Sequence, residues 1–167
     1  ADGKITGVRG TVWAGMGAYL STAAPGIPTI LHGLMLCGPY LIPNVHEDVY
    51  GVYTNTTPVE AYRGAGRPEA TYLLERLIDR FAAKIGKDPV EVRRLNLIPK
   101  FDNGHDVATG LTYDSGDYHA NLDKALHHVG YEALRKEQAE ARAQGRYLGI
   151  GVCTYVEICG LGPSQVA

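Results

Sequence analysis

The chain has 167 residues and a formal net charge of -2, and 45% of its residues are hydrophobic while 20% are charged. This near-neutral balance gives no support to a nucleic-acid partner, and no run of about 18 apolar residues suggests a membrane span. The composition is typical of a soluble globular segment, which we expect in the cytoplasm. A chain of this length suits one domain, so residues 1–167 are expected to form a single domain.

The first part of the chain predicts two strands and a short helix. Apolar and polar residues partly alternate over residues 4–14, which predicts a strand followed by a loop over 15–26. Residues 29–37 follow Pro28 and place apolar side chains at helical spacing, which predicts a short helix. Residues 45–55 alternate again and predict a second strand. That strand would deliver the chain to a glycine-rich turn.

The strongest helical periodicity covers residues 68–85, where large apolar side chains recur at alternating steps of one and three. Gly86 supplies the stop signal for this helix. Asp88 as N-cap, a proline at the first helical position and Glu91 three residues after the cap predict the start of a second helix. Pro99 marks its end. Two consecutive helices are therefore expected in the middle of the chain.

The last third of the chain predicts a connection, two helices and a strand. Residues 102–117 are rich in Gly, Asp, Asn and Thr and are expected to form a surface connection. Residues 120–129 and 131–144 predict helices that Gly130 separates. Residues 148–158 are β-branched and flanked by glycine, which predicts a strand whose partners lie partly outside this sequence. The fold class expected is α/β (α+β), with mixed strands and several helices.

The most informative segment is 61–69, Ala-Tyr-Arg-Gly-Ala-Gly-Arg-Pro-Glu, which places two arginines and two glycines directly before the helix predicted over 68–85. Glycine lets the backbone approach a ligand closely, and the N–H groups of a first helical turn attract anions. Arginine adds bidentate donors. The pattern indicates an anion-binding turn with Arg63 as the candidate contact, although many glycine-rich turns before helices only bend the chain.

Other residues with reactive or charged side chains have ordinary structural explanations. We expect Arg67 to pair with a nearby carboxylate such as Glu69. Of Arg93 and Arg94, one is expected at the edge of the core and the other in solvent. The cysteines lack metal-type spacing and are expected to be buried reduced thiols, and the histidines are expected to be surface or internally satisfied. These residues are Cys37, Cys153, Cys159, His32, His46, His105, His119, His127 and His128.

Several motifs occur along the chain in the order found in a known family. Residues 38–45 contain Y-x-I-P-N and residues 88–98 contain D-P-x-E-x-R-x-x-N. Together with 53–77 they make the chain resemble the molybdopterin-binding large subunit of the xanthine oxidase and aerobic carbon monoxide dehydrogenase family. Residues 113–118, and residues 149–151 together with 157–164, resemble the carbon monoxide dehydrogenase-type branch in particular. Nearly the whole chain is covered by the resemblance.

This resemblance implies a molybdenum hydroxylase, an oxidoreductase that hydroxylates a small-molecule substrate with oxygen derived from water. Electrons would pass from the molybdenum centre through iron–sulfur clusters to FAD on partner subunits. The cofactor implied is molybdenum-molybdopterin in the cytosine dinucleotide form. Arg63 matches the family's arginine beside this cofactor, and Gly64, Ala65 and Gly66 match the turn that walls the substrate pocket. These four are the candidate cofactor-binding residues.

Family large subunits are several times longer than this sequence, so the resemblance implies that residues 1–167 are a single partial molybdopterin-binding domain, an internal fragment. The expected partners are the remainder of the large subunit and the iron–sulfur and flavin subunits. The family's general-base glutamate would lie outside this sequence, so Glu60 and Glu157 receive no catalytic role. No catalytic residue or metal ligand is assigned. The isolated fragment is expected to be inactive, to carry no cofactor and to expose apolar patches.

Two departures from the family constrain the substrate. Carbon monoxide dehydrogenases with a copper–molybdenum centre carry a cysteine in this turn, where this chain has Gly64, so the soft thiolate that selects Cu(I) is missing. Xanthine-oxidising relatives carry phenylalanine at the position of Ala65 and a purine-binding arginine near Leu31. A small aldehyde or an aromatic N-heterocycle is therefore expected ahead of carbon monoxide. The alternative is a non-enzymatic anion-binding or assembly module on the same scaffold.

Overall fold

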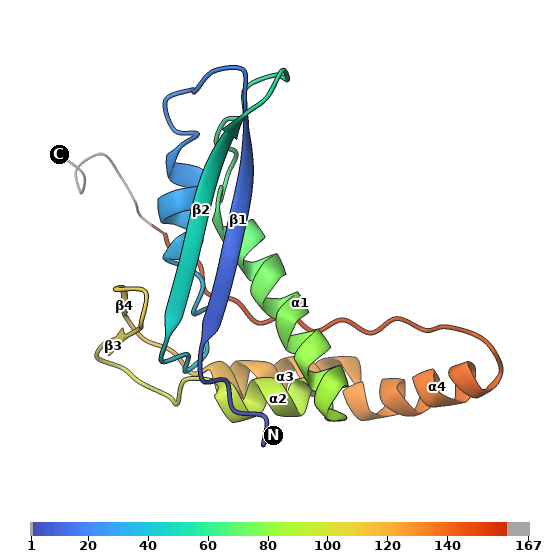
Figure 1. Ribbon diagram of the computed structural model, residues 1–167. Helices are drawn as coiled ribbons and strands as arrows, with labels where there is room; N and C mark the ends of the chain where they lie inside the picture. Colours follow the sequence, from blue (N-terminus) through green and yellow to red (C-terminus); the bar gives the residue numbers. More distant parts are fainter. Residues whose placement is uncertain (1, 160–167) are drawn as a thin grey trace.

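Strands and helices both contribute to the fold, and the computed structural model describes residues 2–159 of the chain. The strand pair stands beside a long helix, and the later helices lie across its lower end (Figure 1). The expected mixed α/β class is confirmed. The elements are β1 (Val8–Gly17), η1 (Ile27–Leu31), β2 (Val45–Tyr53), α1 (Arg67–Ile85), α2 (Pro89–Asn96), β3 (His105–Asp106), β4 (Thr112–Tyr113), α3 (Tyr118–Val129) and α4 (Tyr131–Ala143).

Strands β1 and β2 form a parallel pair in which Val8 lies opposite Val45. The first strand was expected over residues 4–14 and instead begins and ends later, with an irregularity in register between Gly15 and Gly17. A parallel connection needs a crossover, and here it consists of η1 and the segment that leads to β2. Both predicted strands are therefore confirmed, with shifted ends.

One face of this strand pair is exposed and carries an aromatic patch. Trp13 is 71% exposed and stacks on Tyr50, with 4.6 Å between the ring centroids and 16° between the ring planes. Parallel sheets are normally covered on both faces. The pair is therefore the kind of exposed apolar patch that the sequence predicts.

The short helix expected over residues 29–37 forms differently. The structure has a five-residue π-helix, η1, followed by turns such as the one in which Met35 N donates to His32 O at 3.1 Å. Gly33 lies within the expected range and has low helix propensity, whereas Pro28 lies in the first turn, where proline is tolerated. A regular α-helix over the whole range is therefore not formed.

Helices α1 and α2 confirm the two helices predicted in the middle of the chain. Helix α1 follows Gly66 and ends at Gly86, which has a φ of 68° in the left-handed region. The Asp88 carboxylate caps α2 by accepting from Val90 N at 2.8 Å. The main buried cluster comprises Cys37, Tyr40, Ile42, Leu74, Ile78, Ala82, Val90, Val92, Leu97 and Leu122.

A buried ionic network joins α1 to α2. The Arg93 side chain is 0% exposed, and it donates to Glu75 Oε2 and Asp79 Oδ1, both at 2.9 Å, and to the Pro89 carbonyl at 3.1 Å. Tyr40 Oη donates to Glu75 Oε1 at 2.6 Å. Burial, together with the negative charge of Glu75, raises the pKa of Tyr40. Arg93 was expected at the edge of the core but is fully buried. Its charge can be buried because two acidic side chains on α1 accept hydrogen bonds from it.

The connection over residues 102–117 is more ordered than expected. It contains the antiparallel pair β3–β4, and Phe101 and Gly116 bond to each other through both backbone groups. Tyr113 is buried and donates its hydroxyl to the Gly38 carbonyl at 2.9 Å. The strands are too short to show any periodicity in the sequence, which explains why the connection was expected to lie wholly on the surface.

Helices α3 and α4 confirm the two helices predicted near the end of the chain. Asp117 caps α3 by accepting from Ala120 N at 3.0 Å, and Gly130 separates the helices with a φ of 63°. Helix α4 extends away from the rest of the molecule (Figure 1). No helix among residues 2–159 is long and apolar enough to cross a membrane.

The strand predicted over 148–158 does not form within the described residues, because the segment pairs with no other strand there. It runs back from the end of α4 across α1 towards η1 (Figure 1). Alternate side chains are partly buried, including Val152, Val156 and Ile158. We call residues 148–159 the strap. The second of the two family-like segments, 149–151 and 157–164, continues past the strap, and its last residues lie outside the described part of the chain.

Candidate functional site

The candidate turn is built from two successive hydrogen-bonded reversals before α1. Ala65 N donates to the Tyr62 carbonyl at 2.8 Å, and Arg67 N donates to the Gly64 carbonyl at 3.0 Å. Gly64 and Gly66 adopt φ values of 80° and 87°, which other residues rarely tolerate. The glycines in this segment are therefore required by the backbone path itself.

Gly66 has a second requirement, close packing against η1. A Cβ atom at this position would lie 2.6 Å from Leu31 Cβ and 2.8 Å from His32 N. At Gly64 the nearest atoms to a Cβ belong to the Pro68 ring, at 3.8 Å. The turn thus packs tightly against η1 at Gly66, whereas the space next to Gly64 is free.

The predicted contact residues lie at different depths in this turn. Arg63 is exposed, Gly64 and Ala65 are partly exposed, and Gly66 is buried. Among residues 2–159, Arg63 makes no ion pair. Its neighbour Tyr62 is 88% exposed. The structure therefore brings the four candidates together on one turn and leaves Arg63 exposed, while Gly66 packs against η1.

The partner of Arg67 is not Glu69, as the sequence led us to expect, but Glu157. Arg67 Nε lies 2.6 Å from Glu157 Oε1, and the Arg67 side chain is only 13% exposed. The same guanidinium donates to the carbonyls of Ala65 and Ile158, each at 3.3 Å. A residue on the strap therefore reaches the candidate turn, a contact between distant parts of the sequence that local spacing does not reveal.

A cavity of about 410 Å³ lies beside the turn, between β1, η1 and the start of α1. Its wall is mostly apolar but includes Glu60, Glu69 and His32. The nearby Ser21 hydroxyl, followed by the Ala61 N–H that donates to Glu60 Oε1 at 2.8 Å, holds the pKa of Glu60 below its usual value. Glu60 is therefore a carboxylate at neutral pH, and no catalytic role is assigned to it.

The other histidine and cysteine expectations are only partly confirmed. His32 is buried and its Nδ1 lies 2.9 Å from Glu47 Oε1, but this contact lacks hydrogen-bond geometry, so it does not confirm that His32 is internally satisfied. Cys37 is buried as expected, but Cys153 and Cys159 are exposed because they occupy outward-facing positions of the strap. Burial of part of Cys153 raises the pKa of its thiol. Within residues 2–159, no three His, Cys, Asp or Glu side chains are arranged to hold a metal ion.

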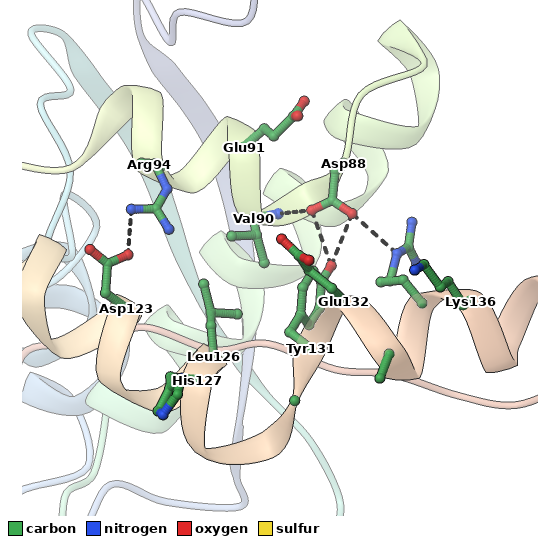
Figure 2. A pocket seen from close by; sticks show the side chains of 13 residues that line it. Asp88, Val90, Glu91, Arg94, Asp123, Leu126, His127, Tyr131, Glu132 and Lys136 are labelled. Atoms are coloured by element: carbon green, nitrogen blue, oxygen red, sulfur yellow. Dashed lines mark hydrogen bonds and ion pairs between the residues drawn. The ribbon is translucent and has the colours of Figure 1, made fainter.

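A larger cavity of about 1040 Å³ lies at the far end of α1, between α2 and the corner of α3 and α4 (Figure 2). Its charged groups largely pair with one another. Arg94, which is 43% exposed as expected for a solvated side chain, pairs with Asp123. Asp88 accepts from Tyr131 Oη at 3.0 Å and pairs with Arg135 at 3.1 Å. We assign no ligand to this cavity.

Comparisons with known proteins place the chain in a family. Residues 1–97 match the model of the molybdopterin cofactor-binding domain. The chain is 43% identical to the carbon monoxide dehydrogenase large chain of Hydrogenophaga pseudoflava, over 99% of this chain and 21% of that protein.

Two solved structures are also similar. The first is the Cu,Mo-CO dehydrogenase in its carbon monoxide reduced state, with a TM-score of 0.84 and 36% identity over 98% of this chain and 22% of that one. The second is the quinoline 2-oxidoreductase of Pseudomonas putida 86, with a TM-score of 0.81 and 34% identity over 92% of this chain and 20% of that one.

The chain spans about a fifth of the length of these three relatives. Within that fifth, its elements follow theirs over nearly the whole chain. The family model covers more than half of the residues, and it includes the turn at Arg63. The chain therefore belongs to the molybdopterin cofactor-binding domain family, as a part of the molybdenum-dependent oxidoreductase large subunits of the carbon monoxide dehydrogenase and xanthine oxidase group.

Proposed function

We propose that this chain is the part of a molybdenum hydroxylase large subunit that presents the Arg63 turn to the molybdenum cofactor. The observation that carries the proposal is an exposed arginine without an ion pair among residues 2–159, on a glycine-supported turn at the start of a 19-residue helix. Its donors serve no other described residue, so they are available to a ligand. An anionic ligand would use them.

The residues of the turn fit an oxygen-rich, negatively charged group. Arg63 would donate to cofactor oxygens from its exposed guanidinium, and Gly64 leaves space for close approach. Gly66 would hold the turn on η1 rather than touch the cofactor directly. When bound, the cofactor would supply hydroxylation with oxygen from water and would accept the electrons released.

The proposed substrate is a small aldehyde or an aromatic N-heterocycle. Gly64 has no side chain to ligate copper, so the position offers no thiolate for Cu(I). Ala65 leaves the pocket wall without an aromatic ring for purine stacking. The similarity to a quinoline 2-oxidoreductase supports a heterocycle, while the similarity to carbon monoxide dehydrogenases keeps carbon monoxide as the competing substrate.

The proposal extends to the assembly in which the chain works. The cofactor would carry the cytosine dinucleotide, and iron–sulfur and FAD-containing subunits would receive the electrons in the cytoplasm. The rest of the large subunit would cover the exposed Trp13 and Tyr50 face. Residues 1–167 would act as a single partial domain and would be inactive alone. These points rest on the family resemblance, with the uncovered strand pair as structural support.

Metal and nucleotide analysis of the large subunit that contains this chain, purified with its partner subunits, tests the proposal. We expect stoichiometric molybdenum and pterin, cytidine monophosphate on acid hydrolysis, and no stoichiometric copper. Stoichiometric copper would overturn the argument from Gly64 and restore carbon monoxide as substrate. Absence of molybdenum and pterin, in a host that loads a known relative, would favour the non-enzymatic anion-binding or assembly module.

A further inference from the structure

We propose that the ion pair between Arg67 and Glu157 is a positioning device that fixes the Arg63 turn for the cofactor. This inference rests on the proposed function of that turn. It assigns a role to the strap, which the sequence presents only as an unpaired strand. It also assigns a role to Glu157 that is neither catalytic nor part of the core.

The Arg67 guanidinium connects the turn to the strap directly. Its Nε lies 2.6 Å from the Glu157 carboxylate, while its two terminal nitrogens donate to the carbonyls of Ala65 and Ile158. One acceptor belongs to the turn and two belong to the strap. The planar, forked donors of arginine suit this arrangement, and the single ammonium group of lysine does not reproduce it.

The strap is itself anchored three residues before Glu157. Thr154 N donates to Glu75 Oε2 at 2.9 Å, and the hydroxyls of Tyr40 and Thr154 lie 2.5 Å apart. Glu75 is in turn held by the buried Arg93. Glu157 therefore sits on a fixed segment of backbone, so its carboxylate has a defined place relative to α1.

The turn is held from two sides. Gly66 packs against η1, at a distance that leaves no room for a Cβ atom. Arg67 ties the Ala65 carbonyl to the strap on the other side. Both contacts lie within three residues of Arg63, so both limit the path of the backbone that carries it. A site held in this way loses less conformational freedom when a ligand binds.

The test uses Glu157→Gln and Arg67→Lys in the large subunit, purified with its partner subunits. Glu157→Gln keeps the shape of the side chain and removes its charge. Arg67→Lys keeps the positive charge but replaces the planar, forked guanidinium with a single ammonium group. The matched control is Arg94→Lys, because Arg94 also forms an ion pair outside the turn. Molybdenum and pterin content are measured on the folded, monodisperse fraction, alongside the thermal unfolding temperature.

We expect several-fold less molybdenum and pterin in both variants, with unfolding temperatures close to that of the control. Normal cofactor content in the folded fraction, with a lowered unfolding temperature, would show that the pair only stabilises the fold and would overturn the inference. If the wild-type subunit itself contains no molybdenum, the proposed function fails. If Arg63→Ala loses cofactor but Glu157→Gln and Arg67→Lys do not, only the positioning role fails.

Discussion

Arg93 and Arg63 belong to two regions that use the same side chain in opposite ways. Arg93 is fully buried, and Glu75, Asp79 and a backbone carbonyl accept its donors. Arg63 is exposed and forms no ion pair with any residue in the range 2–159. A buried charge must be paired, because desolvation is costly. An exposed arginine carries no such requirement.

The difference separates residues that hold the fold from residues that we propose to serve a ligand. The region around Arg93 joins α1, α2 and the strap, so its charges are explained by folding. The region around Arg63 has a backbone supported by η1 and Arg67, yet the guanidinium itself supports nothing among the described residues. We infer that changes near Arg93 alter stability, whereas changes at Arg63 alter cofactor content.

The largest effect on stability is expected for Glu75→Ala. This change removes one acceptor of the buried Arg93 and the anchor of Thr154, so the free energy of unfolding should fall by about 3–5 kcal/mol. Urea unfolding measures the loss. Arg76→Ala is the control, because Arg76 is exposed and only weakly paired. A loss no larger than that of the control would remove the distinction between the two regions.

The next effect is expected in the turn, where Gly66→Ala and Gly64→Ala are compared. Both glycines have positive φ, so each change should cost about 1–2 kcal/mol of strain. At Gly66 the new methyl group also meets η1, which should add about 1–3 kcal/mol. Urea unfolding of the two variants gives the difference. Equal losses in the free energy of unfolding would mean that η1 shifts to accommodate the new methyl group and does not hold the turn in place.

A smaller effect is expected at alkaline pH in the framework around α2. Burial, followed by the hydrogen bond to Asp88, raises the pKa of Tyr131 to about 12 from an ordinary value of 10.0. The folded state therefore retains this proton more tightly, so its contribution to stability is present below pH 10 and is lost as the pH rises towards 12. Unfolding measured across this range should show a shallower fall in Tyr131→Phe than in the wild type; identical slopes would contradict the assignment.

The smallest effect is expected for Arg94→Ala. The pair with Asp123 is largely exposed, so its loss should cost no more than about 1 kcal/mol in urea unfolding. This variant shows how little an exposed arginine matters to the fold. A loss comparable to that of Glu75→Ala would mean that exposure does not separate the two kinds of arginine.

Local signals in the sequence predicted α1 and α2 well. Asp88 and Gly86 act within a few residues of their own position, so the ends of α1 and α2 could be predicted without knowing the rest of the structure. The same holds for the turn, where glycines and Pro68 mark the entry to α1. The family resemblance, now confirmed, added the ligand to this local prediction.

Contacts between distant segments could not be predicted in this way. Glu157 meets Arg67 only because the strap folds back across α1. The strap was expected to be a strand because an extended segment that packs on a helix shows the same alternation of side chains as a strand in a sheet. The depth of Arg93 was also missed, although Glu75 and Asp79 lie one helical turn apart on α1 and could have indicated a buried cation.

The most direct test compares molybdenum and pterin content in Arg63→Ala and Arg94→Ala large subunits, purified with their partner subunits from the same host. Both changes remove an exposed arginine, but only Arg63 lies on the candidate turn. We predict that Arg63→Ala loses most of its molybdenum and pterin, while Arg94→Ala retains wild-type content and both remain folded. Full cofactor content in Arg63→Ala would contradict the assignment of this turn to the cofactor.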